Sequence, residues 1–313
     1  MKIKLLAQKL LKDEQGLAVV LVSLAMTVLI GALALVTDFG LVAFNKSKLA
    51  NAADAAALAG VQELPENPAL ASQIAQSYAQ ANGLQVNQVE VKLVPDLDSS
   101  QYVGVQVIAS KTVEYVLGKI WGFSSLQLQS QATAQVMPIT SVYGAAPLFI
   151  PDTQPLVFGQ PYTLRSKDAD FGPGNFGALD FPNSAGAKDF SYYLANGYEG
   201  IIKVSYEIDT LTGVKKQKTI EGISQRIAKC THNCTHEHFQ PDCPRLLKLP
   251  VVHYDQLNGH KPVTVVGFAA FLVDDVRDAG SIEITGRFVK TLAEGEGSLN
   301  QVDYGLRTAK LVQ

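Results

Sequence analysis

The feature that most constrains this chain is an apolar stretch near its start. Residues 16–36 carry no charged side chain and consist largely of Val, Leu, Ala and Ile. A helix of this length rises by about 1.5 Å per residue, so it is about as long as the hydrocarbon core of a bilayer is thick. We therefore predict a transmembrane helix at residues 16–37, with membrane lipid as the first partner of the chain.

The residues before this stretch indicate its orientation. Residues 1–15 contain four lysines against one aspartate and one glutamate. Lysines beside a first span favour the cytoplasmic side, so we expect a cytoplasmic basic tail at residues 1–15 and an extracytoplasmic remainder. A cleaved secretory signal is the alternative, since residues 32–34 read Ala-Leu-Ala. The apolar run exceeds the roughly 7–15 residues of a signal peptide, which favours a retained anchor.

The helix is expected to continue beyond the membrane. Residues 38–64 are rich in alanine and contain no proline, whereas Pro65 and Pro68 follow and would end a helix. We predict a helical stem of the kind found in pilins at residues 38–64. It would extend the span into one rod of roughly fifty residues, held together by the good helix propensity of alanine.

Small residues recur along this rod at the spacing of one helical face. Such a face lets a second helix approach closely, which predicts self-association or docking onto pilin or platform helices of a pilus machine. The alternative is that the alanines pack the stem onto the chain's own exported part. The face comprises Ser23, Thr27, Gly31, Ala52, Ala56 and Gly60.

The N-terminal region resembles the TadE/TadG-type proteins of tight-adherence (Flp) pilus assembly. The resemblance rests on the basic tail, the span, the exit motif Asp38-Phe39-Gly40 and the sequence NAADAAALAG at residues 51–60, which follow one another in the order of that family. It implies a single-pass membrane protein with an exported domain that acts in pilus assembly or anchoring and performs no chemistry.

Two features place the chain within that resemblance. Processed pseudopilins of this system carry a glutamate five residues after the glycine at the cut, whereas Leu21 stands at that distance from Gly16, which favours the unprocessed TadG-like branch. Many TadG-like proteins also carry a von Willebrand A metal motif, D-x-S-x-S. The string DLDSS at residues 96–100 fails at its third position, so that site is not carried over.

Residues 65–140 are expected to form a small α+β domain. Helical spacing of apolar residues predicts helices at 67–82 and 113–122, and alternation of apolar and polar residues predicts strands at 86–94, 102–110 and 126–137. The predicted common core comprises Ile108, Val116, Ile120 and Trp121.

Residues 141–313 are expected to form a mostly β domain, so that the whole chain is α+β. Apolar segments divided by Gly, Pro and Asp turns predict its strands, and a helix ending at Gly197 is expected within it. The tail after Lys290 has little periodicity and would lie across a sheet. The predicted strands lie at 159–164, 200–208, 263–273 and 280–289.

The densest group of reactive side chains lies at residues 230–243. This segment holds all three cysteines of the chain and three of its five histidines. Thiolates and imidazoles are the ligands that zinc prefers, so a structural zinc site is one hypothesis, with His236 as the alternative histidine. Export favours a disulfide between two of the cysteines, and free thiols are the third possibility. The predicted ligands are Cys230, Cys234, His238 and Cys243.

Other classes of function find little support. The string GPGNFG at residues 172–177 matches G-x-G-x-x-G, but no strand precedes it and no long helix follows it, so a nucleotide is not an expected partner. The formal net charge of −3 gives no basic surface for nucleic acid. The acidic residues have no EF-hand spacing, so solvated turns are favoured over calcium; they are Asp168, Asp170, Asp180, Asp274, Asp275 and Asp278.

These observations lead to one main hypothesis and two alternatives. The chain is expected to be a membrane-anchored, non-enzymatic component of a Flp-type pilus assembly or secretion apparatus, with no cofactor other than the possible zinc. A surface-anchored adhesin or ligand-binding β module is the first alternative. A metal-dependent envelope hydrolase is the second, and it would require the Cys/His segment to leave a coordination position open.

Overall fold

The computed structural model describes residues 14–96, 100–166, 175–182, 187–211, 216–253 and 262–312. The chain divides into two compact units. The first comprises residues up to Gln135 together with the last three residues of the chain, and the second comprises Val136–Lys310. The division lies at Gln135, five residues before the boundary expected at residue 140, and the predicted stem and small α+β domain share the first unit.

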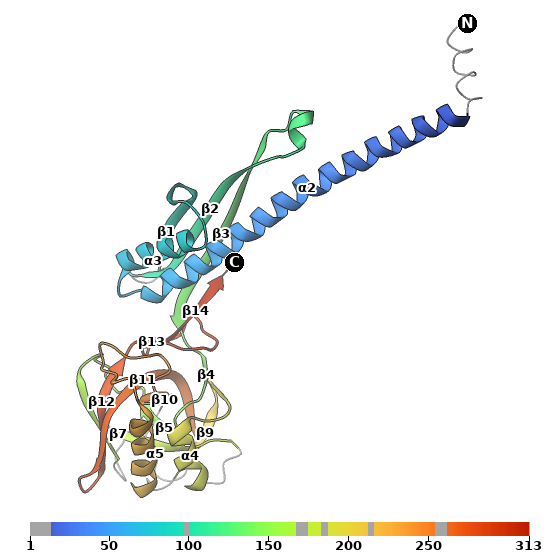
Figure 1. Ribbon diagram of the computed structural model, residues 1–313. Helices are drawn as coiled ribbons and strands as arrows, with labels where there is room; N and C mark the ends of the chain where they lie inside the picture. Colours follow the sequence, from blue (N-terminus) through green and yellow to red (C-terminus); the bar gives the residue numbers. More distant parts are fainter. Residues whose placement is uncertain are drawn as a thin grey trace. The chain divides into compact units, whose positions relative to one another are not determined.

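One long helix dominates the first unit. Helix α2 spans Glu14–Gly60, 47 residues without a break, so the predicted span and stem form a single rod (Figure 1). Among the described residues it is the one helix long and apolar enough to cross a membrane, with a mean hydropathy of 2.8 over its most apolar window. Its N-terminal half exposes large apolar side chains, as expected for a lipid-facing helix, among them Val19, Leu24, Ile30 and Val36.

The C-terminal half of α2 packs onto the rest of the unit. After the short turn η1 (Val61–Glu63), helix α3 (Pro68–Ala81) runs back alongside α2. The turn η2 (Val86–Gln88) then leads into three antiparallel strands, β1 (Val89–Pro95), β2 (Tyr102–Glu114) and β3 (Ser125–Pro138). These elements confirm the predicted α+β architecture.

Alanine makes the contact between α2 and α3 possible. Three alanines on α2 and three on α3 have no exposed surface, and a Cβ atom at Gly60 would lie 2.7 Å from the carbonyl oxygen of Ala71. Small side chains allow two helix backbones to approach this closely. The interface is then stabilised by dispersion contacts between closely packed backbone and small side-chain atoms, without large side chains. The six alanines are Ala53, Ala56, Ala57, Ala71, Ala75 and Ala79.

The predicted core of the small domain was wrong at two of its members. Val116 is 58% exposed and Ile120 is 74% exposed, while Ile108 is half-buried and Trp121 lies outside the described side chains. The helix expected at 113–122 is absent because β2 and β3 stay paired as far as Glu114 and Ser125. Residues 115–124 therefore form the tip of a hairpin, whose one helical turn is η3 (Gly118–Trp121). The core includes instead Val105, Val107 and Ala109 on β2, together with the alanines of both helices.

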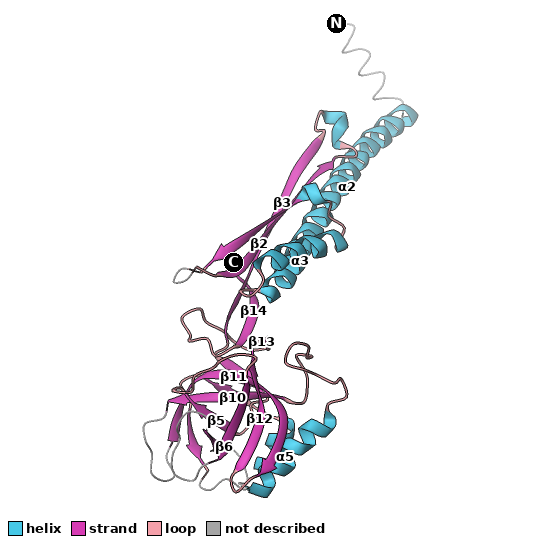
Figure 2. Cartoon of the chain, turned by 90° about the vertical axis from the view of Figure 1, so that its left-hand side faces the viewer, coloured by secondary structure: helices cyan, strands magenta, loops and turns pink. Residues whose placement is uncertain are grey.

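The second unit is built on a sheet that closes on itself. Its strands follow the order β10-β5-β7-β6-β12-β11-β9, and β10 also pairs with β11 while β7 pairs with β9. Figure 2 shows these strands curving around a common interior with α5 outside them. The strands are β5 (Leu148–Pro151), β6 (Pro161–Ser166), β7 (Asn175–Asp180), β9 (Glu207–Thr210), β10 (Leu246–His253), β11 (Pro262–Asp278) and β12 (Ile282–Val289).

Smaller elements complete the second unit. Helices α4 (Ala187–Asn196) and α5 (Lys216–Lys229) pack against each other, and α5 also contacts β11. Strand β4 (Ser141–Tyr143) pairs with β8 (Ile201–Lys203). The tail after Lys290, whose sequence shows little periodicity, forms two strands, β13 (Thr291–Leu292) and β14 (Leu306–Val312), and the last two residues of β14 belong to the first unit.

The interior of the second unit is aromatic and aliphatic. Four phenylalanines, Phe149, Phe268, Phe271 and Phe288, are almost completely buried, and Phe271 stacks edge to face on Phe288 with ring centroids 4.9 Å apart. Phe149 and Phe268 belong to one buried cluster and Phe271 and Phe288 to another. Because side chains alternate along each strand, the two clusters lie on opposite faces of the sheet. This unit is the mostly β region that the sequence predicted.

Candidate functional site

The three cysteines of the second unit converge in the folded chain. Cys230 follows the last residue of α5, Cys234 lies in the loop after it, and Cys243 precedes β10. Their sulfur atoms all lie within 4.8 Å of one another, and the Sγ atoms of Cys230 and Cys243 are 3.6 Å apart. Cys234 and Cys243 are buried and Cys230 is partly exposed. We call these three residues the cysteine cluster.

Two thiols of the cysteine cluster differ in the direction in which their surroundings shift the pKa. Burial, together with the neighbouring thiols, raises the pKa of the Cys243 thiol to about 12. Burial also opposes ionisation of Cys230, but hydrogen bonds from the backbone N–H groups of Cys234 and His232 and from the two other thiols outweigh it and lower the pKa of Cys230. Cys230 therefore ionises more readily than Cys243.

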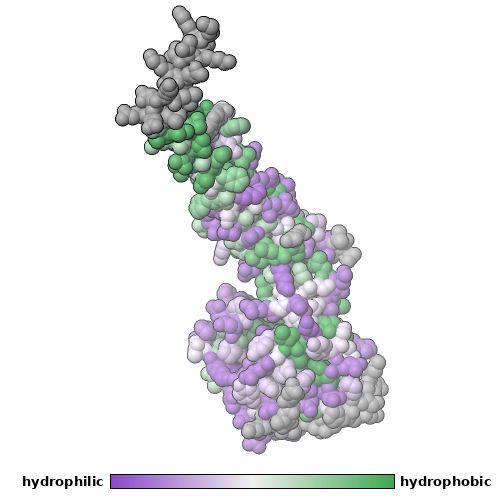
Figure 3. Space-filling view, turned by 90° about the vertical axis from the view of Figure 1, so that its right-hand side faces the viewer, coloured by the Kyte–Doolittle hydropathy of each residue, from purple (hydrophilic) through white to green (hydrophobic). Residues whose placement is uncertain are grey.

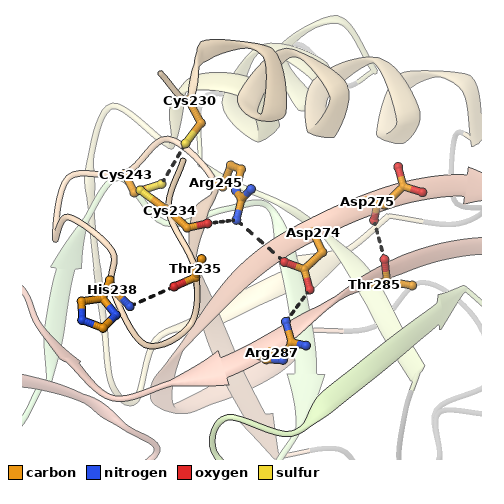
Figure 4. A network of polar contacts seen from close by, with 10 residues as sticks. All are labelled: Cys230, Cys234, Thr235, His238, Cys243, Arg245, Asp274, Asp275, Thr285 and Arg287. Atoms are coloured by element: carbon orange, nitrogen blue, oxygen red, sulfur yellow. Dashed lines mark hydrogen bonds and ion pairs between the residues drawn. The ribbon is translucent and has the colours of Figure 1, made fainter. Parts of the chain in front are cut away.

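Arginine side chains tie the loop around the cysteine cluster to the sheet. The Arg245 guanidinium donates a hydrogen bond of 2.8 Å to the backbone oxygen of Cys234 and lies 3.8 Å from the Asp274 carboxylate (Figure 4). Asp274 in turn accepts a hydrogen bond of 2.9 Å from Arg287 on β12. The carboxylate of Asp274 thus pairs with two arginines.

A second arginine is buried beside the cluster. Arg226 on α5 donates hydrogen bonds to the backbone oxygens of Leu194, Pro244 and Leu246. Burial lowers the pKa of its guanidinium to about 10, which leaves it charged at neutral pH. Among the described residues no carboxylate lies within ion-pair distance of Arg226, so its charge is balanced only by carbonyl dipoles.

The histidine that the sequence placed with the cysteines lies apart from them. The structure brings Cys230, Cys234 and Cys243 together, but within the described ranges no imidazole nitrogen joins the sulfur atoms. Figure 4 shows the ring of His238 pointing away from the three sulfurs. Its backbone N–H is held by the Thr235 hydroxyl at 3.2 Å, in a tight turn of the loop.

Asp278 and the described part of the glycine string, the remaining motifs noted in the sequence, lie in ordinary strands of the fold. Asp278 accepts a hydrogen bond of 3.1 Å from the backbone N–H of Gly280 and lies 3.8 Å from Lys216. In the glycine string, residues 172–174 fall outside the described residues, as do Asp168 and Asp170, and the residues that follow form strand β7. A phosphate-binding loop of the dinucleotide type would need a helix there.

The first unit carries a polar contact at the predicted end of the membrane span. Asp38 on α2 is only 8% exposed. Its Oδ1 atom accepts a hydrogen bond of 2.7 Å from the N–H of Val116, and its Oδ2 atom accepts bonds of 3.2 Å from Leu117 and 2.6 Å from Gly118. Three successive N–H groups at the hairpin tip thus surround one carboxylate, an arrangement that favours an anion. We call this contact the Asp38 lock.

The Asp38 lock keeps its carboxylate ionised. Burial opposes the charge, but the hydrogen bonds from Val116, Gly118 and Leu117 outweigh it and lower the pKa of Asp38. Two lysines add further ties between α2 and the hairpin. Lys111 donates to the Asn45 side chain at 2.9 Å, and Lys46 donates to the backbone oxygen of Gln129 at 2.7 Å.

Apolar surface surrounds the lock. Phe39 is 79% exposed and Phe123 is 66% exposed, and Val116 and Ile120 lie on the same hairpin tip. A groove of about 640 Å³ runs between α2 and the tip, with mostly apolar side chains along it. Figure 3 shows apolar surface continuing from here along α2 toward its start. Soluble surfaces rarely expose so much contiguous apolar area.

Comparison with known families agrees with this geometry. Residues 16–63 match the family model described as "Putative Flp pilus-assembly TadE/G-like". These residues are a TadE/G-like segment. The match coincides with the apolar helix α2 and its turn η1, and it confirms the resemblance inferred from the sequence. Searches of the curated proteins and of the solved structures found no match to this chain.

The predicted packing face of the TadE/G-like segment falls into two different surroundings. Ala52, Ala56 and Gly60 are buried within the first unit, where Gly60 faces α3. Ser23 and Thr27 are exposed, and their hydroxyls donate to the backbone oxygens four residues earlier. Gly31 has open space where a Cβ atom would stand. Ala52, Ala56 and Gly60 are therefore covered by their own unit. Of the six residues of the predicted face, Ser23, Thr27 and Gly31 remain open to a partner helix.

Sequence reasoning missed the role of Asp38. In the sequence, Asp38 was recognised only as part of the motif at the end of the span. The N–H groups that it binds lie 78 to 80 positions further along the chain, so no local pattern contains them. A signal existed, because an acid placed directly after an apolar span is costly near lipid unless something binds it.

Proposed function

We propose that this chain is a single-pass membrane protein and a non-enzymatic component of a Flp-type pilus assembly apparatus. The observation that carries the proposal is the coincidence of the TadE/G-like match at residues 16–63 with a helix whose N-terminal half is apolar and exposed. In this proposal residues 1–15 are cytoplasmic, and the part of the first unit that follows residue 37 and the whole second unit are extracytoplasmic, following the lysine bias of the tail.

The proposed mechanism is mechanical. Helix α2 carries the span and the stem without a break, and its C-terminal half is clamped to α3 and β2 by close alanine packing. The Asp38 lock adds a second attachment at the membrane end of the same unit. A force applied to the span would therefore reach the folded unit through two attachments along one rigid rod.

Lipid contact at the hairpin tip forms part of the proposal. The lock places Val116, Ile120 and Phe123 beside Asp38, the first residue after the predicted span. At that level the side chains meet the boundary between acyl chains and head groups, where apolar and aromatic residues are favoured.

Substitution of Gly31 tests the partner-binding face. Gly31→Leu adds bulk where the chain itself leaves open space, so the first unit is expected to keep its stability. Loss of close helix approach is expected to reduce co-purification of pilin or platform proteins about tenfold, because van der Waals packing at small residues drives helix association in membranes. Ala32→Leu is the matched control, because Ala32 is exposed on the adjacent position of the helix.

Replacement of the whole span separates the proposal from the adhesin alternative. Residues 16–37 are exchanged for an unrelated Leu/Ala span of equal length, and pilus assembly is scored in cells. We expect the chain to reach the membrane but assembly to fail. Normal assembly with the foreign span would contradict a specific role for the TadE/G-like segment and would favour an adhesin that needs only an anchor.

The Asp38 lock gives a pH dependence with a defined sign. The pKa of Asp38 is lower in the folded chain than its ordinary value of 3.8, so its stabilising effect is complete above that value and is lost as the pH falls below it. Asp38→Asn is expected to raise hydrogen exchange at the amides of residues 116–118 about tenfold at neutral pH, because a neutral amide binds N–H groups more weakly.

Two comparisons check the Asp38 prediction. Asp54→Asn, on the same helix, is the control and should leave those amides protected. With exchange rates expressed as protection relative to the intrinsic rate at each pH, wild-type protein brought to acid pH should fall to the protection of the Asp38 variant, whereas the protection in the variant itself should change little over the same range. Equal protection in wild type and Asp38→Asn at neutral pH would show that the carboxylate does not hold the tip.

A further inference from the structure

We propose that Cys230, Cys234 and Cys243 bind one zinc ion through three thiolates, which fixes the loop at residues 230–243 to the end of α5 and the start of β10. This site is independent of the pilus proposal, since it lies in the second unit and involves none of the residues of the TadE/G-like segment. Its role would be structural.

The spacing of the sulfur atoms fits a shared ion. Zinc–sulfur bonds of about 2.3 Å at tetrahedral angles place neighbouring sulfurs about 3.8 Å apart. Cys230 and Cys243 are 3.6 Å apart, and all three sulfurs lie within 4.8 Å of one another. Small side-chain rotations would bring the third thiol to the same spacing. The fourth ligand would come from outside the cysteine cluster.

The loop that carries the cysteine cluster is held by hydrogen bonds outside the thiols. The Arg245 guanidinium donates to the backbone oxygen of Cys234 at 2.8 Å, and the backbone N–H of Cys243 donates to the backbone oxygen of Gln240 at 3.0 Å. Contacts that orient the ligand residues are the second layer of a metal site.

Charge balance gives an independent argument. Three thiolates on Zn²⁺ leave a net charge of −1 beside the buried Arg226, whose guanidinium donates a hydrogen bond of 2.9 Å to the backbone oxygen of Pro244, the residue after Cys243. Within the described part of the chain no carboxylate pairs with Arg226, so the guanidinium has a buried positive charge to be neutralised. A buried charge without a counter-ion is costly. The zinc–thiolate group would supply the missing counter-ion.

The alternatives account for less of this geometry. A disulfide joins two of the three sulfurs, so the third cysteine would remain a free thiol inside the cluster. Three free thiols would leave the partly exposed Cys230 open to oxidation. A bound ion uses all three and protects them.

The test uses the full-length chain purified in detergent without added metal or reductant. Elemental analysis is expected to give about one zinc per chain, and denaturation with a chelator should release three reactive thiols before any reduction. Exchange into Co²⁺ alone should produce the intense thiolate-to-cobalt absorption bands. One reactive thiol before reduction and three after it would establish a disulfide and overturn the proposal.

Variants identify the ligands. We expect zinc affinity to fall by more than about 100-fold in each of Cys230→Ser, Cys234→Ser and Cys243→Ser. This loss exceeds the roughly 10–100-fold loss that follows removal of a group that only supports a ligand. His238→Asn should retain the ion, because its ring points away from the sulfurs. Circular dichroism confirms that each variant is folded, and the cobalt spectrum of the wild type needs no variant. Three reactive thiols with no bound zinc and no cobalt bands would also overturn the proposal.

Discussion

Arg226→Met is expected to lower the free energy of unfolding of the second unit by about 3–5 kcal/mol, because two buried acceptors and one partly buried acceptor would lose their donor. The guanidinium binds the backbone oxygen of Leu194, near the end of α4, and those of Pro244 and Leu246, at the start of β10. Methionine fills much of the volume but donates no hydrogen bond. The carbonyl groups would then stay buried without partners, which is the costly outcome.

The reference variant for Arg226 is its neighbour Gln225→Met. Gln225 is exposed on the same helix, and both substitutions introduce methionine, so differences in helix propensity largely cancel. Thermal and urea unfolding of the full chain, followed by hydrogen exchange of β10 amides, measures the effect. A loss below about 1 kcal/mol for Arg226→Met would mean that water or a local shift satisfies the three carbonyls.

Ala75→Leu is expected to destabilise the first unit by about 1–3 kcal/mol, since the added carbons have no space between two packed helices. Ala75 has no exposed surface, and its Cβ atom lies 2.9 Å from where a Cβ atom would stand at Gly60. Relief requires α3 to move away from α2, which also opens the contacts of the remaining alanines.

Ala69→Leu isolates the packing effect. Ala69 lies on the exposed side of α3, so the same substitution there keeps the helix propensity change and removes the steric conflict. Unfolding of the two variants in detergent, followed by hydrogen exchange of α3 amides, should differ by the overpacking cost. If both variants unfold alike, the two helices can shift enough to accommodate the larger side chain, although Ala75 has no exposed surface.

Local patterns predicted most elements of both units. The period of two in residues 102–110 marked β2, and the helical spacing in residues 67–82 marked α3, because each pattern lies within one element. The hairpin tip was missed for the opposite reason. Residues 113–122 have helical spacing of apolar residues, but pairing between β2 and β3 persists to Glu114 and Ser125, and no local pattern contains that partner.

The cysteine segment divides in the same way. Density of Cys and His residues between 230 and 243 was visible in the sequence, and it directed attention to the right loop. Which of those side chains meet depends on the turn that Thr235 makes with His238 and on the position of Cys243 before β10. Those contacts put three sulfurs together and turn the His238 ring away.

The apolar span and the TadE/G-like character of residues 16–63 were determined by the sequence alone, because length, hydropathy and small-residue spacing are properties of consecutive residues. Closure of the sheet in the second unit, the Asp38 lock and the cysteine cluster were decided by tertiary structure. Each depends on groups that are distant along the chain and meet only when burial of apolar surface has folded the backbone around them.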